Sequence, residues 1–279
     1  MGLIKILSQK IPLGDGVEWL VNTIISNFGG VLDTFSAFIK TMMDGLEGFL
    51  SYGHPLLFIG IFALITWLLR KDIKLTIGVT LGFLLVLNLR MWDPLIATMA
   101  SIITSVLISL AVGIPVGILK SRSKIVDIIT RPILDFMQTI PPFVYLIPAL
   151  MFFGLGTVPG IVATVVFAIA PPIRLTYLGL EQVDEELKEA GRAFGSTPAQ
   201  MLFKVELPAA LPSIMMGINQ CIMLSLSMVV IAAMIGAGGL GKPVLRSLST
   251  VDIGLGFEAG LGVVILAITL DRLFGRETT

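Results

Sequence analysis

The sequence has little charge, one cysteine and one histidine. Charged residues are 14% of its 279 residues and the formal net charge is zero, which gives no indication of a nucleic-acid partner. Because Cys221 is the lone cysteine, a disulfide framework is excluded, and with His54 as the lone histidine a Cys/His metal site is implausible. Residues 1–16 also lack the long apolar core and small-residue cleavage site of a signal peptide.

Apolar residues, by contrast, dominate the chain. They make up 55% of it, and the mean hydropathy is +0.96. This composition is too apolar for a soluble domain and predicts an all-α, polytopic membrane protein. We expect about seven transmembrane helices, at about 55–69, 73–89, 95–119, 132–153, 158–177, 209–235 and 257–270.

The N-terminal residues follow a different pattern. In residues 1–54, acidic residues alternate with apolar ones at helical spacing, which predicts amphipathic helices. These helices would lie either on the outer membrane surface or against the flank of the protein. In the membrane core, Gly113 and Gly117 predict a close approach between helices. The predicted parts are an N-terminal segment 1–54, two peripheral helices 55–91, a core 92–273 and a tail 274–279.

Positive charge in the loops predicts the orientation. The loops after the first and third predicted helices carry the basic residues Arg70, Lys71, Lys74, Lys120, Arg122, Lys124 and Arg131. Cytoplasmic loops carry an excess of Lys and Arg, so both loops should be cytoplasmic. Alternation then places the N-terminus outside, and it places the loop 181–208 and the C-terminus in the cytoplasm.

The loop 181–208 is the longest polar stretch in the second half of the chain. It predicts two short helices, the first ended by Gly195 and the second capped by Thr197 with Pro198 at its first position. We expect the second helix to stop near Leu207–Pro208. A unit that is polar on one side lies in water and packs its apolar side against its own protein or against a partner.

The run from Gln138 to Pro148 is rich in proline. Pro141 and Pro142 remove helix donors, so the helix must kink or break there. A broken helix at membrane depth is tolerated only inside protein or beside a cavity. The break is therefore either a static kink or a gate.

Neutral polar residues are the remaining candidates for a path through the membrane. Asn219 and Gln220 are adjacent amides that cannot both face lipid cheaply, and Ser225 follows them in the same predicted helix. A serine in a membrane helix more commonly bonds to its own helix or a neighbour. The predicted helices hold few carboxylates, which argues against a carrier driven by an ion gradient.

The glycine-rich run 236–243 matches G-x-G-x-x-G and nearly matches a P-loop. Pro243 occupies the position of the P-loop Ser or Thr, and a membrane helix precedes the run where both motifs require a strand. We therefore interpret it as a glycine turn. No catalytic residues and no ATPase site are predicted in the chain, so energy for any pumping must come from elsewhere.

Two stretches resemble a known family. Glu189-Ala190-Gly191, three residues, Gly195, nine residues and Val205-Glu206-Leu207-Pro208 resemble the EAA signature of ABC importer permeases, with Gly191 in place of alanine and Val205 in place of isoleucine. The run Asp135 to Pro148 resembles permeases for glycine betaine and proline betaine. The likeness extends over about residues 92–273.

The resemblance implies a fold and a set of site residues. The fold would be the type I ABC importer transmembrane fold, and the loop 181–208 would be a coupling loop that docks on an ATPase. The docking residues would be Glu189, Ala190, Gly191, Phe194, Gly195, Phe203, Leu207 and Pro208. The candidate residues for the translocation path or gate are Gln138, Thr139, Pro141, Pro142, Tyr145, Asn219, Gln220 and Ser225.

The resemblance also implies an assembly in the bacterial plasma membrane. Two copies of the chain would combine with two cytoplasmic ABC ATPase subunits, which bind the ATP and Mg²⁺, and with an extracytoplasmic substrate-binding protein. The chain itself would need no cofactor and no metal. The solute would be glycine betaine or a related osmoprotectant. The alternatives are choline, proline or methionine in the same architecture, or a stand-alone ion-coupled carrier.

Overall fold

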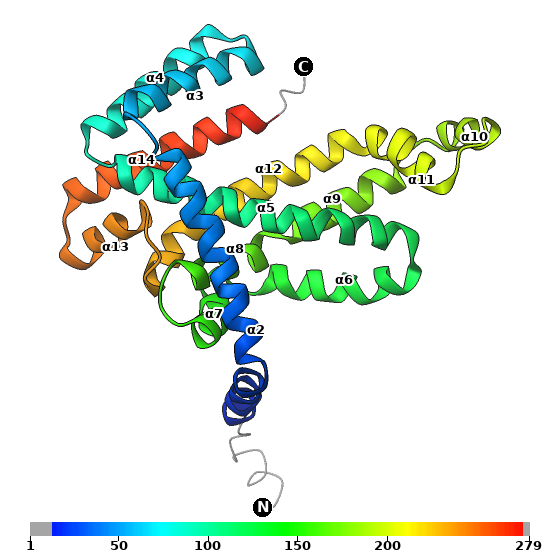
Figure 1. The fold of residues 1–279 in the computed structure, drawn as a ribbon, viewed down its shortest axis with the longest axis horizontal. Helices are drawn as coiled ribbons and strands as arrows, with labels where there is room; N and C mark the ends of the chain where they lie inside the picture. Colours follow the sequence, from blue (N-terminus) through cyan, green and yellow to red (C-terminus); the bar gives the residue numbers. More distant parts are fainter. Residues whose placement is uncertain (1–12, 276–279) are drawn as a thin grey trace, which may run out of the picture.

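The structure is a computed structural model that describes residues 13–275, and across this range it contains helices and no strand (Figure 1). In chain order the elements are α2 (Leu13–Leu50), α3 (Pro55–Arg70), α4 (Ile73–Asn88), α5 (Trp92–Arg122), α6 (Lys124–Thr139), the 3₁₀ helix η1 (Pro142–Tyr145), α7 (Leu146–Phe153), α8 (Thr157–Ala168), α9 (Ala170–Glu181), α10 (Glu185–Ala193), α11 (Pro198–Gln200), the π-helix η2 (Met201–Glu206), α12 (Leu207–Ala232), the 3₁₀ helix η3 (Ala233–Ile235), α13 (Gly241–Thr250) and α14 (Ile253–Phe274).

Four helical stretches in the described range are long and apolar enough to cross a bilayer. They correspond to the predicted helices at 95–119, 158–177, 209–235 and 257–270. Each is longer than its predicted apolar run, because the helix continues into the flanking residues. Their bounds are Trp92–Arg122, Thr157–Glu181, Pro198–Ile235 and Ile253–Phe274.

The predicted helices at 55–69 and 73–89 are present as α3 and α4, with bounds within one residue of the prediction. α3 meets α2 at a bend of 93°, and α4 is a shorter apolar helix of 16 residues. The predicted helix 132–153 is a broken pair, α6 and η1–α7, bent by 110°. The break predicted at Pro141 and Pro142 is confirmed, because α6 ends at Thr139 and η1 begins at Pro142. Counting each bent pair as one crossing gives up to six candidate spans among residues 13–275.

The basic stretch after α5 is helical, which corrects the predicted loop. α6 begins at Lys124 and includes Arg131. Ser123 alone separates it from α5, and the Ser123 hydroxyl accepts a hydrogen bond from the Val126 N–H at 3.5 Å. This N-terminal cap, with Asp127 in the first turn, lets the chain re-enter a helix at once.

The predicted close approach at Gly113 and Gly117 is confirmed. A Cβ atom on Gly117 would lie 2.7 Å from Thr176 Cβ and 2.8 Å from the Ile173 carbonyl oxygen, and one on Gly113 would lie 3.0 Å from Pro172 Cβ. The cytoplasmic half of α5, in the predicted orientation, therefore packs against α9 with backbone nearly touching backbone. Small residues allow such contacts between membrane helices.

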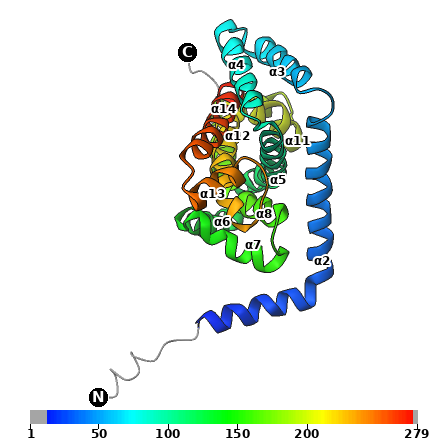
Figure 2. The same ribbon diagram turned by 90° about the vertical axis from the view of Figure 1, so that its left-hand side faces the viewer.

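The long helix α2 lies along one side of the bundle, and its N-terminal part bends away (Figure 2). Ile39 and Met43 are buried, in a cluster with Val158 and Ile161 of α8. Of the two predicted placements for this segment, its second half therefore takes the flank of the protein. Residues 1–12 of the predicted segment 1–54, and residues 276–279 of the predicted tail, lie outside the described range.

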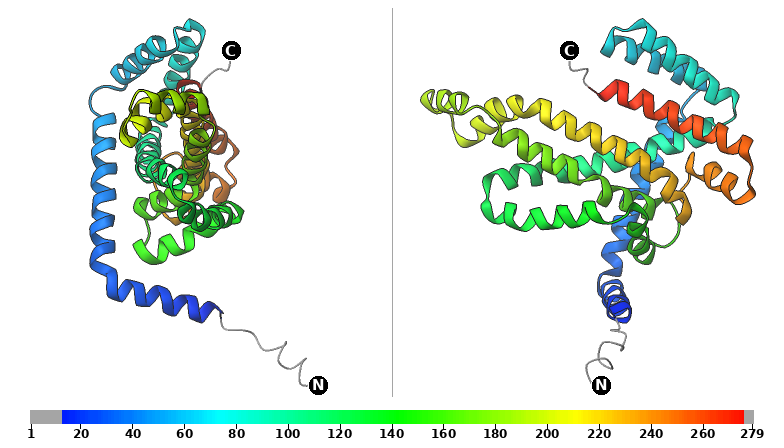
Figure 3. Two further views of the ribbon diagram at one scale, coloured as in Figure 1. Left: turned by 90° about the vertical axis from the view of Figure 1, so that its right-hand side faces the viewer. Right: turned by 180° about the vertical axis from the view of Figure 1, so that it is seen from behind.

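Two contacts join separate helix ends at one end of the bundle. The Arg70 guanidinium donates a hydrogen bond to the Gly275 carbonyl, which joins the α3–α4 turn to the end of α14. Arg122, the last residue of α5, forms an ion pair with Glu206 at the base of the 184–208 segment. This segment, which we call the elbow, projects beyond the bundle at the end where α5 turns into α6 (Figure 3).

The close packing of α5 on α9 generates a prediction. Gly117→Ala should lower the stability of the protein by about 1–3 kcal/mol, because the methyl group overlaps a backbone carbonyl that cannot move freely. Gly78→Ala in α4 is the matched control, since a Cβ there meets no atom within 4 Å. Thermal unfolding in detergent measures both, and an unchanged midpoint for Gly117→Ala would contradict the packing.

Candidate functional site

The elbow turns sharply at Gly195, as its sequence predicts. Gly195 has φ +73°, in the left-handed region that favours glycine. The Ser196 N–H donates to the Gly191 carbonyl at 3.0 Å, and the Gly195 N–H donates to the Arg192 carbonyl at 2.9 Å. This pair of bonds is a Schellman motif, which satisfies the last carbonyls of α10 and reverses the chain.

The helix after the turn begins with a capping box. The Thr197 hydroxyl accepts a hydrogen bond from the Gln200 N–H at 3.3 Å, and the Gln200 side chain accepts one from the Thr197 N–H at 2.9 Å. Pro198 occupies the first turn, where its missing N–H costs nothing. The predicted cap and the predicted proline position are both confirmed.

The prediction that this helix stops near Leu207–Pro208 is wrong. The chain continues through the π-helix η2 directly into α12, and Pro208 lies in the first turn of α12. The Leu207 N–H bonds to the Leu202 carbonyl five residues back. This wider π turn relieves the crowding that a proline ring causes in a regular α-helix, so the helix does not need to end.

The two arms of the elbow pack against each other at Gly191. A Cβ on Gly191 would lie 2.7 Å from Met201 Cε and 3.6 Å from Val205 Cγ2. Gly191 and Met201 are both buried. Glycine at this position, where the resembled signature has alanine, therefore brings α10 within contact of η2.

The outer surface of the elbow exposes large apolar side chains. Phe194 is 91% exposed and Phe203 is 66% exposed. Among the other predicted docking residues, Gly191 is buried, Leu207 is partly buried, and the exposed ones are Glu189, Ala190, Gly195 and Pro208. Exposed phenylalanines on a polar projection mark a surface that a partner can cover.

Glu206 and Arg122 are residues of this region that the sequence analysis did not assign. Glu206 is only 5% exposed, and both of its oxygens face the Arg122 guanidinium, with Arg122 Nη1 at 3.3 Å from Oε1. The position of Glu206 between the apolar residues Val205 and Leu207 could have predicted that its carboxylate is buried. Buried acids are paired, so a basic partner could have been expected, although not which one.

The predicted gate residues on the broken helix lie together. Gln138 and Thr139 are exposed at the end of α6, and Pro141 and Pro142 begin the turn into η1. Tyr145 is buried, and its hydroxyl donates to the Met137 carbonyl. Tyr145 belongs to a cluster that also contains Met228 of α12, so the break packs against the C-terminal half of α12.

The three predicted residues of α12 lie apart from this break. Asn219 donates a hydrogen bond to Asp271 of α14 at 3.4 Å and lines a cavity of about 450 Å³ near the α3–α4 turn. Gln220 is exposed, and Ser225 donates to the carbonyl of Cys221 in its own helix at 2.8 Å. Within one chain, the eight predicted path residues therefore do not form a single site. Five lie at the break, and the three on α12 lie apart from it.

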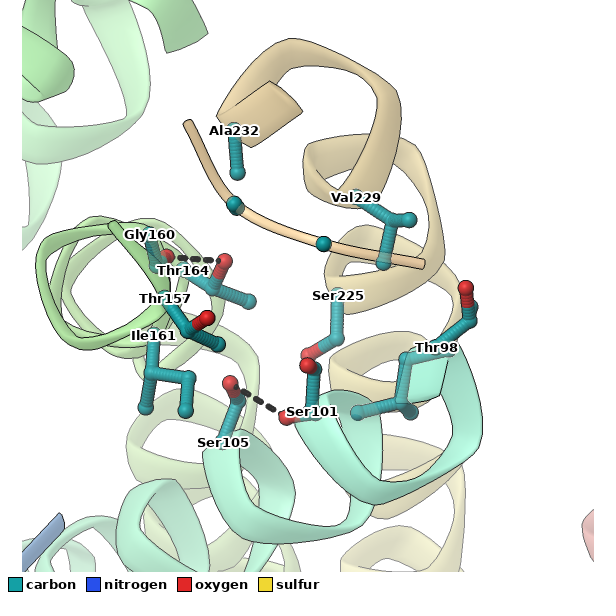
Figure 4. A pocket seen from close by; sticks show the side chains of 13 residues that line it. Thr98, Ser101, Ser105, Thr157, Gly160, Ile161, Thr164, Ser225, Val229 and Ala232 are labelled. Carbon is teal, nitrogen blue, oxygen red and sulfur yellow. Dashed lines mark hydrogen bonds between the residues drawn. The ribbon is translucent and has the colours of Figure 1, made fainter. Parts of the chain in front are cut away.

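Ser225 also lines a small cavity where α5, α8 and α12 meet (Figure 4). Its volume is about 20 Å³, enough for a water molecule and too small for an organic solute. Hydroxyls surround it, but those of Ser105 and Thr164 donate to carbonyls of their own helices at 2.8 Å and 2.7 Å. The hydroxyl oxygens of Ser105 and Thr164 can still accept hydrogen bonds from a molecule in the cavity. The polar lining consists of Thr98, Ser101, Ser105, Thr157, Thr164 and Ser225.

The glycine-rich run 236–243 forms a turn between helices. Gly236 and Gly239 have φ +89° and +76°, and the Leu240 N–H donates to the Thr98 hydroxyl at 2.8 Å. The run follows the helices α12 and η3, so it lacks the strand that both nucleotide motifs require. Within residues 13–275, no three His, Cys, Asp or Glu side chains gather where they could hold a metal ion.

The fold and the elbow define the class of protein: a helical, multi-pass membrane protein with a projecting segment at one end. Residues 109–275 match the family described as "Binding-protein-dependent transport system inner membrane component". The match covers more than half of the chain, and the chain belongs to this family. It is therefore a multi-pass protein of the inner membrane.

Two curated relatives are similar over nearly the whole chain. The glycine betaine transport system permease protein OpuAB of Bacillus subtilis (strain 168) is 48% identical over 264 residues, which are 95% of this chain and 93% of the relative. The glycine betaine/carnitine transport permease protein GbuB of Listeria monocytogenes serotype 1/2a (strain 10403S) is 48% identical over 266 residues, which are 94% of each chain.

A solved structure shows the same fold. The inward-facing MetNI methionine ABC transporter, in its native crystal form, matches with a TM-score of 0.58 at 24% identity, over 65% of this chain and 91% of that chain. At this identity the likeness concerns the fold alone. The predicted all-α type I ABC importer transmembrane fold is confirmed, and the resemblance to permeases of this family is confirmed by the relatives.

The capping box generates a second prediction. Thr197→Ala should weaken the elbow by about 1 kcal/mol, because the Gln200 N–H loses its acceptor. Amide exchange at Gln200 should become correspondingly faster. Ser196→Ala is the control, since the Schellman motif uses the backbone N–H of Ser196, which the substitution keeps. Equal exchange rates in the two variants would argue against the cap.

Proposed function

We propose that this chain is the permease subunit of an ATP-driven importer for glycine betaine or a related quaternary-amine osmoprotectant. The observation that carries the proposal is the 48% identity, across nearly the full chain, to permeases named for glycine betaine transport. The exposed elbow supports it, because a subunit that receives energy from a partner needs a projecting contact surface.

In the proposed assembly, two copies of the chain combine with two cytoplasmic ABC ATPase subunits and an extracytoplasmic solute-binding protein. The ATPases bind ATP and Mg²⁺, and this chain has no hydrolytic role. Phe194 and Phe203, the exposed phenylalanines of the elbow, bury their rings in the ATPase surface. Closure of the ATPases draws the paired elbows together and turns the solute cavity from the outside to the inside.

The proposed orientation has the elbow in the cytoplasm, the N-terminus outside and the C-terminus inside. The hydrogen bond from Arg70 to Gly275 and the ion pair between Arg122 and Glu206 gather the predicted cytoplasmic loops at the elbow end. Their Lys and Arg residues agree with a cytoplasmic location under the positive-inside rule.

The choice of solute rests on the relatives, because no group of aromatic rings around an open site is found among residues 13–275. Trp92 packs edge-on against Phe58 and Phe83, with ring centroids at 5.4 and 6.4 Å, as in a filled core. Selection of the solute therefore falls to the binding protein. Choline, proline and methionine are the competing solutes, and competition against labelled glycine betaine distinguishes them. Transport by this chain alone, driven by an ion gradient, would favour the stand-alone carrier.

The coupling role generates a third prediction. Gly195→Asp and Glu189→Lys should each abolish solute uptake and weaken co-purification of the ATPase, while the amount of inserted protein stays unchanged. Both positions are exposed, and a Cβ on Gly195 meets no atom within 4 Å. Aspartate tolerates the left-handed conformation better than most residues, so loss of uptake would report on docking.

Phe49→Ser is the control for these variants, because it also changes an exposed residue, in α2 and outside the elbow. It should leave uptake and ATPase association near the wild-type level. Undiminished uptake by both elbow variants would remove the coupling role from the proposal.

The orientation generates a fourth prediction. A membrane-impermeant maleimide should label Phe194→Cys in inside-out vesicles stripped of peripheral proteins, and should label Leu248→Cys in intact cells. Both side chains are exposed, and the single native Cys221 is buried, so background labelling is low. Labelling of Phe194→Cys from outside intact cells would reverse the orientation.

A further inference from the structure

The ion pair between Arg122 and Glu206 joins the elbow to the end of α5. This helix is far from the elbow in the sequence. Glu206 is the last residue of η2, and Arg122 is the last residue of α5, 84 positions earlier in the chain. The Glu206 carboxylate is buried at 5% exposure, while Arg122 is half exposed. Separating the two would leave a buried charge unpaired, so the base of the elbow and the end of α5 hold together.

A second ion pair joins the same end of α5 to α6. The Lys120 ammonium lies 3.3 Å from Asp127 Oδ1 in the first turn of α6, and 4.4 Å from the ring centroid of Tyr177. Lys120 is only 6% exposed. Arg131 adds a contact at 2.9 Å to the other oxygen of Asp127. The first turns of α6 are thus held to the end of α5 by charge as well as by the chain.

α6 leads from these contacts to the broken helix. It runs 16 residues without interruption from Lys124 to Thr139, where the chain turns by 110° into η1 and α7. The break packs on α12 through Tyr145. A contact path of two ion pairs and one helix therefore connects the elbow to the predicted gate.

We infer that Arg122 and Glu206 are positioning residues that pass movement of the elbow to the α5–α6 hairpin and so to the break between α6 and η1. The inference rests on the proposed function, since it requires an ATPase to move the elbow. The continuous helices α9 and α12 carry the same movement to the rest of the bundle. The Arg122–Glu206 ion pair adds a direct link from the elbow to the α5–α6 hairpin, which also contacts α9 at Gly117.

The π-helical geometry of η2 fits this role. Glu206 closes a six-residue π segment, and such segments are wider and less regular than an α-helix. A change in its winding turns Glu206 about the axis of α12. Because Arg122 follows the carboxylate, the end of α5 moves with it.

The experiment measures the ratio of solute transported to ATP hydrolysed. The complete complex, with its ATPase and binding protein, is reconstituted in proteoliposomes with wild-type chain or with Glu206→Gln. We expect Glu206→Gln to lower this ratio by roughly tenfold, because the amide cannot hold the guanidinium as a carboxylate does. The double variant Arg122→Glu with Glu206→Arg should recover most of the ratio, and Arg122→Lys should keep it near wild type.

The matched control is Asp135→Asn. It breaks another ion pair between helices, from Asp135 of α6 to Arg174 of α9, but the Asp135 carboxylate is 61% exposed. An exposed pair contributes little, so the ratio should stay within about twofold of wild type. A purely structural role of Glu206 would lower the yield of complex and leave the ratio unchanged.

An unchanged ratio in the Glu206→Gln complex overturns the inference, whatever the yield. If Glu206→Gln does not assemble, Arg122→Gln is measured instead, because Arg122 is half exposed and its substitution disturbs the fold less. An unchanged ratio of transport to hydrolysis in the Arg122→Gln complex would also contradict the inference. The proposed function is tested by the wild-type complex alone. If the wild-type chain neither stimulates its ATPase nor transports solute with ATP, the proposed function itself is wrong.

Discussion

The constraint on which the structure depends is that backbone donors and acceptors must find partners where water is scarce. Helices meet it along their length, and the difficult places are their ends. Where α6 ends, Pro141 and Pro142 bring no N–H, and the Tyr145 hydroxyl reaches back to the Met137 carbonyl. The elbow, which lies in water, also has its helix ends satisfied, by the backbone bonds around Gly195 and the capping box of Thr197.

Small residues decide how near the helices lie to one another. Gly117 brings α5 onto α9, and Gly217 brings α12 onto the same helix, where a Cβ would lie 3.2 Å from the Pro171 carbonyl oxygen. With three helices this close, α9 and α12 leave the bundle side by side, and the elbow that joins them projects as one unit. The arms of the elbow are closed in the same way, at Gly191.

Three polar contacts join helices at the elbow end. Glu206 binds Arg122, Asp127 binds Lys120, and Asn219 binds Asp271, each pair joining two helices. In a bundle whose interior is apolar, such pairs set which helix ends move together, because parting them exposes a charge without a partner. The elbow also exposes the apolar rings of Phe194 and Phe203. Exposed rings of this kind suit contact with a protein partner.

The sequence by itself determined the features that depend on a few neighbouring residues. Apolar runs marked four membrane helices, Gly195 marked a left-handed turn, and Thr197 with Gln200 marked a helix start, since each is a matter of local hydropathy or local hydrogen bonds. It also carried the family signature. The bounds of α3 and α4 and the break at Pro141 and Pro142 were also predicted. The start of α6 at Lys124 and the angles of the bends were not, because hydropathy does not report how a helix turns.

The tertiary structure alone decided which distant residues meet. The partner of Glu206 lies 84 positions away and that of Asn219 lies 52 positions away. The bends of 93° and 110°, and the burial of Ile39 of α2 against α8, likewise depend on surfaces that form only when the bundle packs. Sequence patterns describe which side chains a helix carries on each face, and packing between helices determines what each face touches.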